Sequence, residues 1–168
     1  ICTGISGYAM TLPILGIGLL ITLFLFFLQQ LVTGGAEDAP FQGTSGGSHP
    51  IIIDIANGVW STKILVVFLA AVAAPVVEET MFRGVLYRQL RSSSCKFPKA
   101  ISILCSVMLV SFLFAAIHPQ GWIAIPALMG IAVGMNLMRE WRGTLIPSMV
   151  VHGVSNGIVV SMMVLMFS

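Results

Sequence analysis

Residues 75–84 read PVVEETMFRG and place two glutamates and an arginine inside a stretch that is otherwise apolar. An unpaired charge at the centre of a membrane helix costs about 2.5–3.5 kcal/mol, so three of them would cost roughly 8–10 kcal/mol. A chain does not carry that cost without compensation. The partners of Glu78, Glu79 and Arg83 are therefore the first question that the sequence raises.

The composition predicts an integral membrane protein. Of the 168 residues, 57% are hydrophobic and 8% are charged, and the mean hydropathy is +1.01. Soluble domains have about 25% charged residues. The net charge of +2 does not come from a basic surface, which excludes a typical nucleic-acid-binding protein. We expect residues 1–168 to form a single membrane domain, and the first residue, Ile1, indicates a piece of a longer chain that can have further helices upstream.

The cysteines do not indicate a disulfide framework or a thiolate zinc site. Cys2, Cys95 and Cys105 are odd in number and widely spaced, without a C-x-x-C motif. We expect three free thiols.

The hydropathy pattern predicts an all-α, polytopic helical bundle. Five segments are apolar and long enough to cross about 30 Å of hydrocarbon: 8–32, 62–91, 100–117, 122–138 and 145–167. Residues 33–50 are rich in Gly and Ser and predict a flexible loop. Residues 51–58 predict a short helix along the membrane surface, because two turns cannot span the bilayer.

The basic residues predict the orientation in the membrane. Segments 88–99 and 139–142 hold most of the Lys and Arg and are expected on the cytoplasmic side. The N-terminus then also lies in the cytoplasm, whereas the 33–50 loop and the 118–121 turn lie outside.

Three pairs of polar or aromatic residues have the four-residue spacing that brings side chains to one helix face. Glu79 and Arg83 form the first pair, while Glu78 points about 100° away and is left to face a cavity. The second pair, Phe114 and His118, allows the phenyl ring to cover the imidazole.

The third pair is His152 and Asn156, flanked by the G-x-x-x-G glycines Gly153 and Gly157. Small residues at this spacing allow close helix packing, which is also the interpretation of Gly130 and Gly134. Polar groups gathered within spans indicate a functional site.

Together, the motifs Glu-Glu-x-x-x-Arg (78–83), Phe-x-x-x-His (114–118) and His-x-x-x-Asn (152–156) resemble those of the CAAX protease and bacteriocin-processing (CPBP) family of intramembrane endopeptidases, which includes CAAX prenyl protease 2. The resemblance covers about half of the chain. It implies peptide-bond hydrolysis in membrane-associated, including prenylated, proteins or peptides within the lipid bilayer.

The resemblance also implies roles for individual residues. Glu78 is the general base that activates a water, and His118 helps to hold that water. His152 and Asn156 stabilise the oxyanion, and the supporting residues are Glu79, Arg83 and Phe114. A carboxylate base and preorganised donors are what peptide hydrolysis requires.

Other interpretations of the same residues stay open. Glu78, His118 and His152 are a possible metal set, since a Glu with two His is a common zinc site, although there is no His-Glu-x-x-His motif. We favour the mechanism without metal because Asn156 is a poor zinc ligand and a good oxyanion donor. A proton- or cation-coupled transporter and a non-catalytic immunity or scaffold protein are the rival functions.

Helix geometry raises a difficulty for this site. Counting about 1.5 Å per residue from the cytoplasmic ends puts Glu78 about 20 Å deep, His118 about 27 Å and His152 about 10 Å. Straight parallel helices would keep these side chains apart. We therefore expect tilted or re-entrant helices, with kinks at four prolines: Pro75, Pro119, Pro126 and Pro147.

Overall fold

The structure, a computed structural model, describes residues 2–33, 55 and 58–166. Its long helices confirm the all-α, multi-pass prediction, because five are long and apolar enough to cross a membrane: Thr11–Val32, Trp60–Ser93, Lys99–Ala116, Trp122–Arg142 and Ile146–Met166. The predicted 33–50 loop and 51–58 helix lie outside the described residues, apart from Thr33, Ile55 and Gly58.

The second span is one helical run with two π-helical segments. It consists of α3 (Trp60–Phe68), η1 (Leu69–Ala73), α4 (Ala74–Glu79), η2 (Thr80–Leu86) and α5 (Tyr87–Ser93), where η1 and η2 are the π-helices. The remaining elements are α1 (Cys2–Thr33), α6 (Lys99–Ala116), the 3-10 helix η3 (Trp122–Ala124), α7 (Ile125–Arg142) and α8 (Ile146–Met166).

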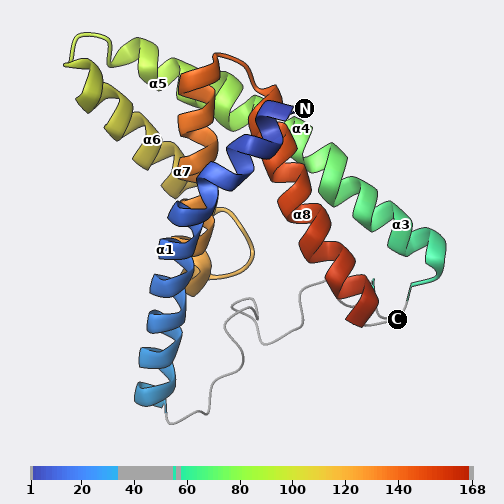
Figure 1. The fold of residues 1–168 in the computed structure, drawn as a ribbon. Helices are drawn as coiled ribbons and strands as arrows, with labels where there is room; N and C mark the ends of the chain where they lie inside the picture. The colour runs from blue at the N-terminus through green and yellow to red at the C-terminus, as the bar shows by residue number, and fades with distance from the viewer. Residues whose placement is uncertain (1, 34–54, 56–57, 167–168) are drawn as a thin grey trace.

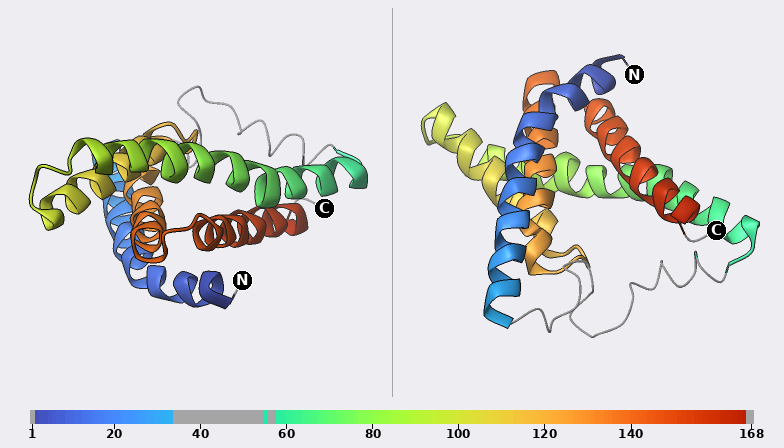
Figure 2. Two further views of the ribbon diagram at one scale, coloured as in Figure 1. Left: turned by 90° about the horizontal axis from the view of Figure 1, so that it is seen from above. Right: turned by 60° about the horizontal axis from the view of Figure 1, so that its bottom comes forward.

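The helices are strongly inclined to one another. Figure 1 shows the α3–α5 run crossing the molecule obliquely, with α8 alongside its first half and α6 turning back beneath its second half. Helix α7 stands between α1 and α6, and the views in Figure 2 agree with these neighbours. The beginning of α1, the α5–α6 turn and the α7–α8 connection lie at the same end of the molecule. The predicted orientation of this end in the membrane stays a prediction.

Helix α1 packs against α7 through glycines. A Cβ on Gly130 would stand 2.8 Å from the Ile14 carbonyl oxygen, and one on Gly18 would stand 2.3 Å from that of Pro126. The interpretation of Gly130 and Gly134 as helix-packing residues is confirmed, because Gly134 faces Thr11 in the same way.

A polar contact also joins these two helices. The Ala127 amide in the first turn of α7 donates to Thr22 Oγ1 of α1 at 3.2 Å. One of the four N-terminal amides without an intrahelical partner is thereby satisfied inside the bilayer.

The buried core lies where η2, α6, α7 and α8 meet. Phe114, Ala132, Met135, Met138 and Val151 form its centre. Many large apolar side chains outside it are exposed, including Leu20 at 68% and Ile64 at 67%, as expected for surfaces that face lipid tails.

The four prolines do not all act as predicted. Pro126 and Pro147 are each the second residue of a helix, where the missing amide is tolerated, so the predicted kinks at these two positions are wrong. Pro119 lies in the turn after α6, and Pro75 is the second residue of α4, which directly follows the π-helix η1. The helices meet because they are inclined, and not because all four prolines bend them.

Candidate functional site

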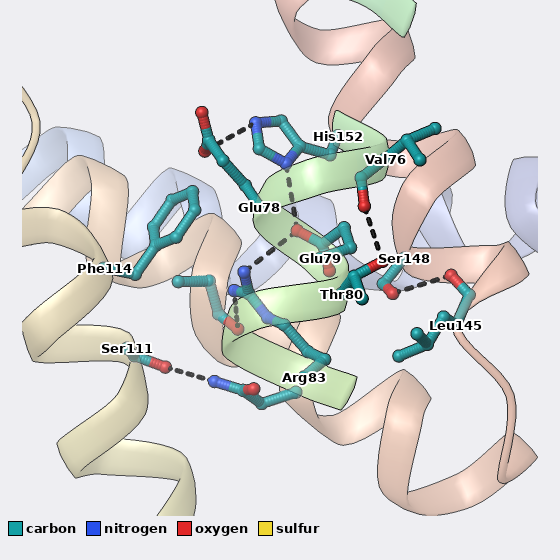
Figure 3. A network of polar contacts seen from close by, with 12 residues as sticks. Val76, Glu78, Glu79, Thr80, Arg83, Ser111, Phe114, Leu145, Ser148 and His152 are labelled. Carbon is teal, nitrogen blue, oxygen red and sulfur yellow. Dashed lines mark hydrogen bonds and ion pairs between the residues drawn. The ribbon is translucent and has the colours of Figure 1, made fainter. Parts of the chain in front are cut away.

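The predicted Glu79–Arg83 pair forms, and it is completely buried. Arg83 Nη1 donates to Glu79 Oε1 at 2.9 Å, and both side chains are 0% exposed. His152 of α8 approaches the same oxygen with Nδ1 at 2.9 Å (Figure 3). Two donors from two helices therefore compensate this one carboxylate.

Arg83 is held on three further sides. Its Nη2 donates to the Ala132 carbonyl of α7 at 3.3 Å, and its guanidinium carbon lies 4.5 Å from the centre of the Phe114 ring. The Phe82 ring lies 6.0 Å away. A planar guanidinium can make all these contacts at once, whereas a lysine ammonium cannot.

Glu78, in contrast, faces two imidazoles, and within the described part of the chain it forms no ion pair with Lys or Arg. Its Oε2 lies 3.8 Å from His118 Nε2 and 3.7 Å from His152 Nε2. This oxygen is buried and has no hydrogen-bond partner among the described residues, although the side chain as a whole is 30% exposed. The two adjacent glutamates thus have different surroundings.

Both imidazoles present Nε2 to Glu78 because their Nδ1 atoms are already engaged. His118 Nδ1 lies 2.5 Å from the Phe114 carbonyl oxygen, which can only accept, so this nitrogen carries the proton. Burial lowers the pKa of His118 below its usual value, with the Phe114 bond as the largest opposing effect. The neutral form therefore has a lone pair on Nε2, directed at the centre of the site.

Phe114 links the parts of the site. Its ring centre lies 4.3 Å from that of His118 and 5.5 Å from that of His152, where the rings meet edge to face. The prediction that Phe114 covers His118 is confirmed, and the same ring lies 4.5 Å from the Arg83 guanidinium carbon.

Asn156 makes a contact with the backbone of the second span. Its Nδ2 donates to the Ala70 carbonyl at 3.1 Å. In η1 the Ala74 amide bonds to Leu69, five residues back, and in that register Ala70 would be the acceptor for Pro75, which has no N–H. Asn156 thus provides the donor that Pro75 lacks.

Gly153 brings α8 close enough for this contact. A Cβ at this position would lie 2.5 Å from the Ala71 carbonyl oxygen, so only glycine fits without movement. His152 and Asn156 flank this point of contact and reach Glu79 and Ala70, respectively. Glu78, His118 and His152 therefore meet, although straight parallel helices would have kept them apart. Asn156 contacts the Ala70 carbonyl instead of any of these three residues.

Sequence reasoning missed a buried side-chain amide on α7, close to the Arg83 contact. Asn136 of α7 is 0% exposed and donates through Nδ2 to Ser111 Oγ of α6 at 2.9 Å. It lies one turn after Ala132, whose carbonyl receives Arg83. An amide within an apolar span was the signal that could have revealed it.

The spacing of the predicted metal set is slightly wide for zinc. Ligand atoms at about 2.0–2.1 Å from a tetrahedral zinc are about 3.4 Å apart, whereas Glu78 Oε2 is 3.7 and 3.8 Å from the imidazoles. No group of three or more His, Cys, Asp or Glu side chains in the described part of the chain has the arrangement of a metal site.

Comparison with known proteins gives a family. Residues 60–158, which contain every predicted site residue, match the family described as Type II CAAX prenyl endopeptidase Rce1-like. Neither the curated proteins nor the solved structures contained a match. Because the match covers more than half of the chain, the resemblance to the CPBP proteases is confirmed. The chain belongs to the Rce1-like family of type II CAAX prenyl endopeptidases.

Proposed function

We propose that the protein is an intramembrane endopeptidase in which Glu78 activates a water molecule to hydrolyse peptide bonds of membrane-associated substrates. Family membership implies a protease, a hydrolase of peptide bonds. The observation that carries the proposed mechanism is the convergence of three atoms, because Glu78 Oε2 lies within 3.8 Å of both His Nε2 atoms. The Glu78 carboxylate and the neutral His118 imidazole both accept hydrogen bonds, so Glu78 Oε2 and His118 Nε2 call for a donor such as water.

The different partners of the two histidines support different roles. His118 bonds to a neutral carbonyl, which favours the neutral imidazole that accepts a hydrogen bond from water. His152 bonds through Nδ1 to the Glu79 carboxylate, which orients its imidazole with Nε2 towards Glu78. His118 then holds the water, whereas His152 and the second Asn156 N–H stabilise the oxyanion.

The proposed reaction balances without a redox step. Glu78 takes a proton from water as the water oxygen attacks the peptide carbonyl carbon. The tetrahedral intermediate collapses, the C–N bond breaks, and Glu78 returns the proton to the leaving amine. Glu79 and Arg83 act through His152, because Glu79 orients its imidazole and Arg83 holds Glu79 in place.

The test is cleavage by purified protein in nanodiscs, using a peptide with a prenylated cysteine near its C-terminus and the same peptide without the prenyl group. Glu78→Gln keeps the shape of the side chain and removes the base, so we expect cleavage to fall by about 10²–10⁴-fold. His118→Ala and His152→Ala should behave similarly.

Glu140→Gln is the matched control, because Glu140 pairs with Arg91 and lies outside the site. It should cleave within a few-fold of the unmodified protein. Undiminished cleavage by Glu78→Gln would overturn the proposed mechanism. Proton flux into liposomes that depends on Glu78, without cleavage of either peptide, would favour the transporter.

Chelation tests the metal alternative in the same assay. The Nδ1 bonds of His118 and His152 would also orient them as metal ligands. Cleavage that a strong chelator leaves unchanged supports the mechanism without metal. Loss of activity that added zinc restores would assign Glu78, His118 and His152 to a metal instead.

A further inference from the structure

Positive charge is concentrated at one end of the molecule. Six of the eight Lys and Arg residues lie in segments at this end: Arg88, Arg91, Lys96, Lys99, Arg139 and Arg142. The other two are Lys63 and Arg83. The six lie on α5, the α5–α6 turn, the beginning of α6 and the end of α7. Figure 1 shows that the α5–α6 turn and the end of α7 share that end of the molecule. Glu140 is the one acidic residue in these segments.

A cavity of about 540 Å³ opens within this basic end. It lies between α5 and the beginning of α6 and is lined by Arg91, Ser92, Cys95, Phe97, Lys99 and Ser102. One candidate span ends at Ser93 and the next begins at Lys99, so the cavity lies between the ends of two spans, where lipid headgroups are expected. Phe97 and Trp141 are more than 60% exposed, as is typical of aromatic residues at that level.

The wall of the cavity is held by an ion pair. Arg91 binds Glu140 of α7 with two hydrogen bonds, Nε to Oε2 at 3.1 Å and Nη2 to Oε1 at 2.9 Å. Its Nη1 donates to Ser102 Oγ, which is also 2.5 Å from Ser94 Oγ. Glu140 thereby compensates Arg91, so the exposed Lys99 gives the lining its net positive charge.

The backbone also contributes positive charge to the cavity. Lys99 is the first residue of α6, an 18-residue helix, and Pro98 before it makes no side-chain cap. The partial positive charge of the helix N-terminus therefore acts on the same cavity as the Lys99 ammonium. Serine hydroxyls are the only uncharged polar side chains among the lining residues.

We propose that this cavity binds the headgroup phosphate of an anionic phospholipid. The level in the bilayer, the net positive lining and the exposed Ser92 hydroxyl all suit a phosphate carried by a lipid. Lys99 provides the charge that binds it, and Arg91 shapes the wall. The site is separate from the proposed catalytic residues and does not depend on the proposed function.

Cys95 provides a local readout, because it lines the cavity and is exposed. In a Cys2→Ser/Cys105→Ser background, the uncharged reagent N-ethylmaleimide would label Cys95 in nanodiscs of phosphatidylcholine, with or without phosphatidylglycerol. We expect phosphatidylglycerol to slow the labelling several-fold. Lys99→Gln should weaken the apparent affinity for phosphatidylglycerol in this assay about fivefold, which is the effect of one basic residue near an anionic surface.

Arg142→Gln is the matched control. It removes one exposed positive charge from the same end but from outside the cavity, and it should leave the protection of Cys95 unchanged within twofold. Equal weakening by Lys99→Gln and Arg142→Gln would overturn the proposal, because the effect would then be diffuse surface attraction. If inorganic phosphate protected Cys95 in phosphatidylcholine nanodiscs as well as phosphatidylglycerol does, the phosphate would not have to come from a lipid, and the proposal would be overturned.

Discussion

Two neighbouring glutamates differ in what surrounds them. Glu79 receives Arg83 and His152 through one oxygen and is completely buried. Glu78 projects from another face of the same helix towards two imidazole nitrogens. Adjacent residues on a helix diverge by about 100°, so one segment can hold a carboxylate bonded to Arg83 and His152 beside another that faces two imidazoles.

The pKa of His118 gives a prediction at the residue scale. Burial lowers this pKa, so the imidazole stays neutral until the pH falls below about 6.5, the usual value for histidine. We expect kcat/KM to fall on the acid side only below that pH, because protonation removes the lone pair that accepts a hydrogen bond from water. A profile of kcat/KM against pH in nanodiscs measures this.

The same shift affects folding stability with a defined sign. The folded state binds fewer protons at His118 than the unfolded state, so this contribution to stability is lost as the pH falls from about 6.5 through the lowered pKa. Glutamine does not titrate, so the profile of residual kcat/KM against pH for His118→Gln should lose the acid-side fall that protonation of His118 causes. A fall in kcat/KM that His118 causes above pH 6.5 would contradict the prediction.

At the scale of elements, a proline in one helix and a glycine in another combine to dock α8. Pro75 leaves the Ala70 carbonyl without its expected backbone donor, and Asn156 supplies one. Gly153 allows the necessary approach to Ala71. The second span and α8 therefore contact each other through backbone groups as well as through their charged side chains.

The two glycines of this G-x-x-x-G motif should differ when each is changed to alanine. A Cβ on Gly153 would meet the Ala71 carbonyl oxygen at 2.5 Å, whereas a Cβ on Gly157 would meet the Ala71 methyl group at 3.4 Å. We expect Gly153→Ala to push α8 away, lower the melting temperature and reduce cleavage at least tenfold, because a misplacement of about 1 Å can cost 10²-fold in rate.

Gly157→Ala is the matched control and should keep nearly normal activity and stability. Thermal unfolding in detergent and cleavage in nanodiscs measure the two effects. Similar behaviour of both variants would show that close approach at Gly153 does not set the position of His152.

At the scale of the whole molecule, α1 is part of the bundle although it lies outside the matched segment 60–158. The close packing of α1 on α7 predicts that Gly130→Ala lowers stability, because the new Cβ would stand 2.8 Å from the Ile14 carbonyl oxygen. We expect this variant to unfold at a lower temperature. Gly16→Ala should be neutral or stabilising, because no atom lies within 4 Å of that Cβ and alanine favours helix by about 0.5–1 kcal/mol.

Equal melting temperatures for the two variants would contradict the proposed packing of α1. Unfolding followed by fluorescence of the three tryptophans, all of which lie outside α1, would report whether the rest of the bundle depends on this packing.

The spans and the pairs within one helix were predictable from the sequence, because hydropathy and a four-residue spacing act locally. Glu79–Arg83 and Phe114–His118 both formed as expected. The contacts between helices depend on inclination, which no local pattern fixes. Sequence reasoning therefore predicted that the motifs belong together but did not predict the Ala70 and Ala132 carbonyls that receive Asn156 and Arg83.

The Glu79–Arg83 pair also has a consequence for biosynthesis. Its partners are four residues apart, so the pair can form within the second span alone, as that helix enters the membrane. The bond from His152 to Glu79 closes across 73 residues and requires α8 to be in place. The nascent chain can thus neutralise its most buried charges early, while the complete set around Glu78 assembles only after α8 has been inserted.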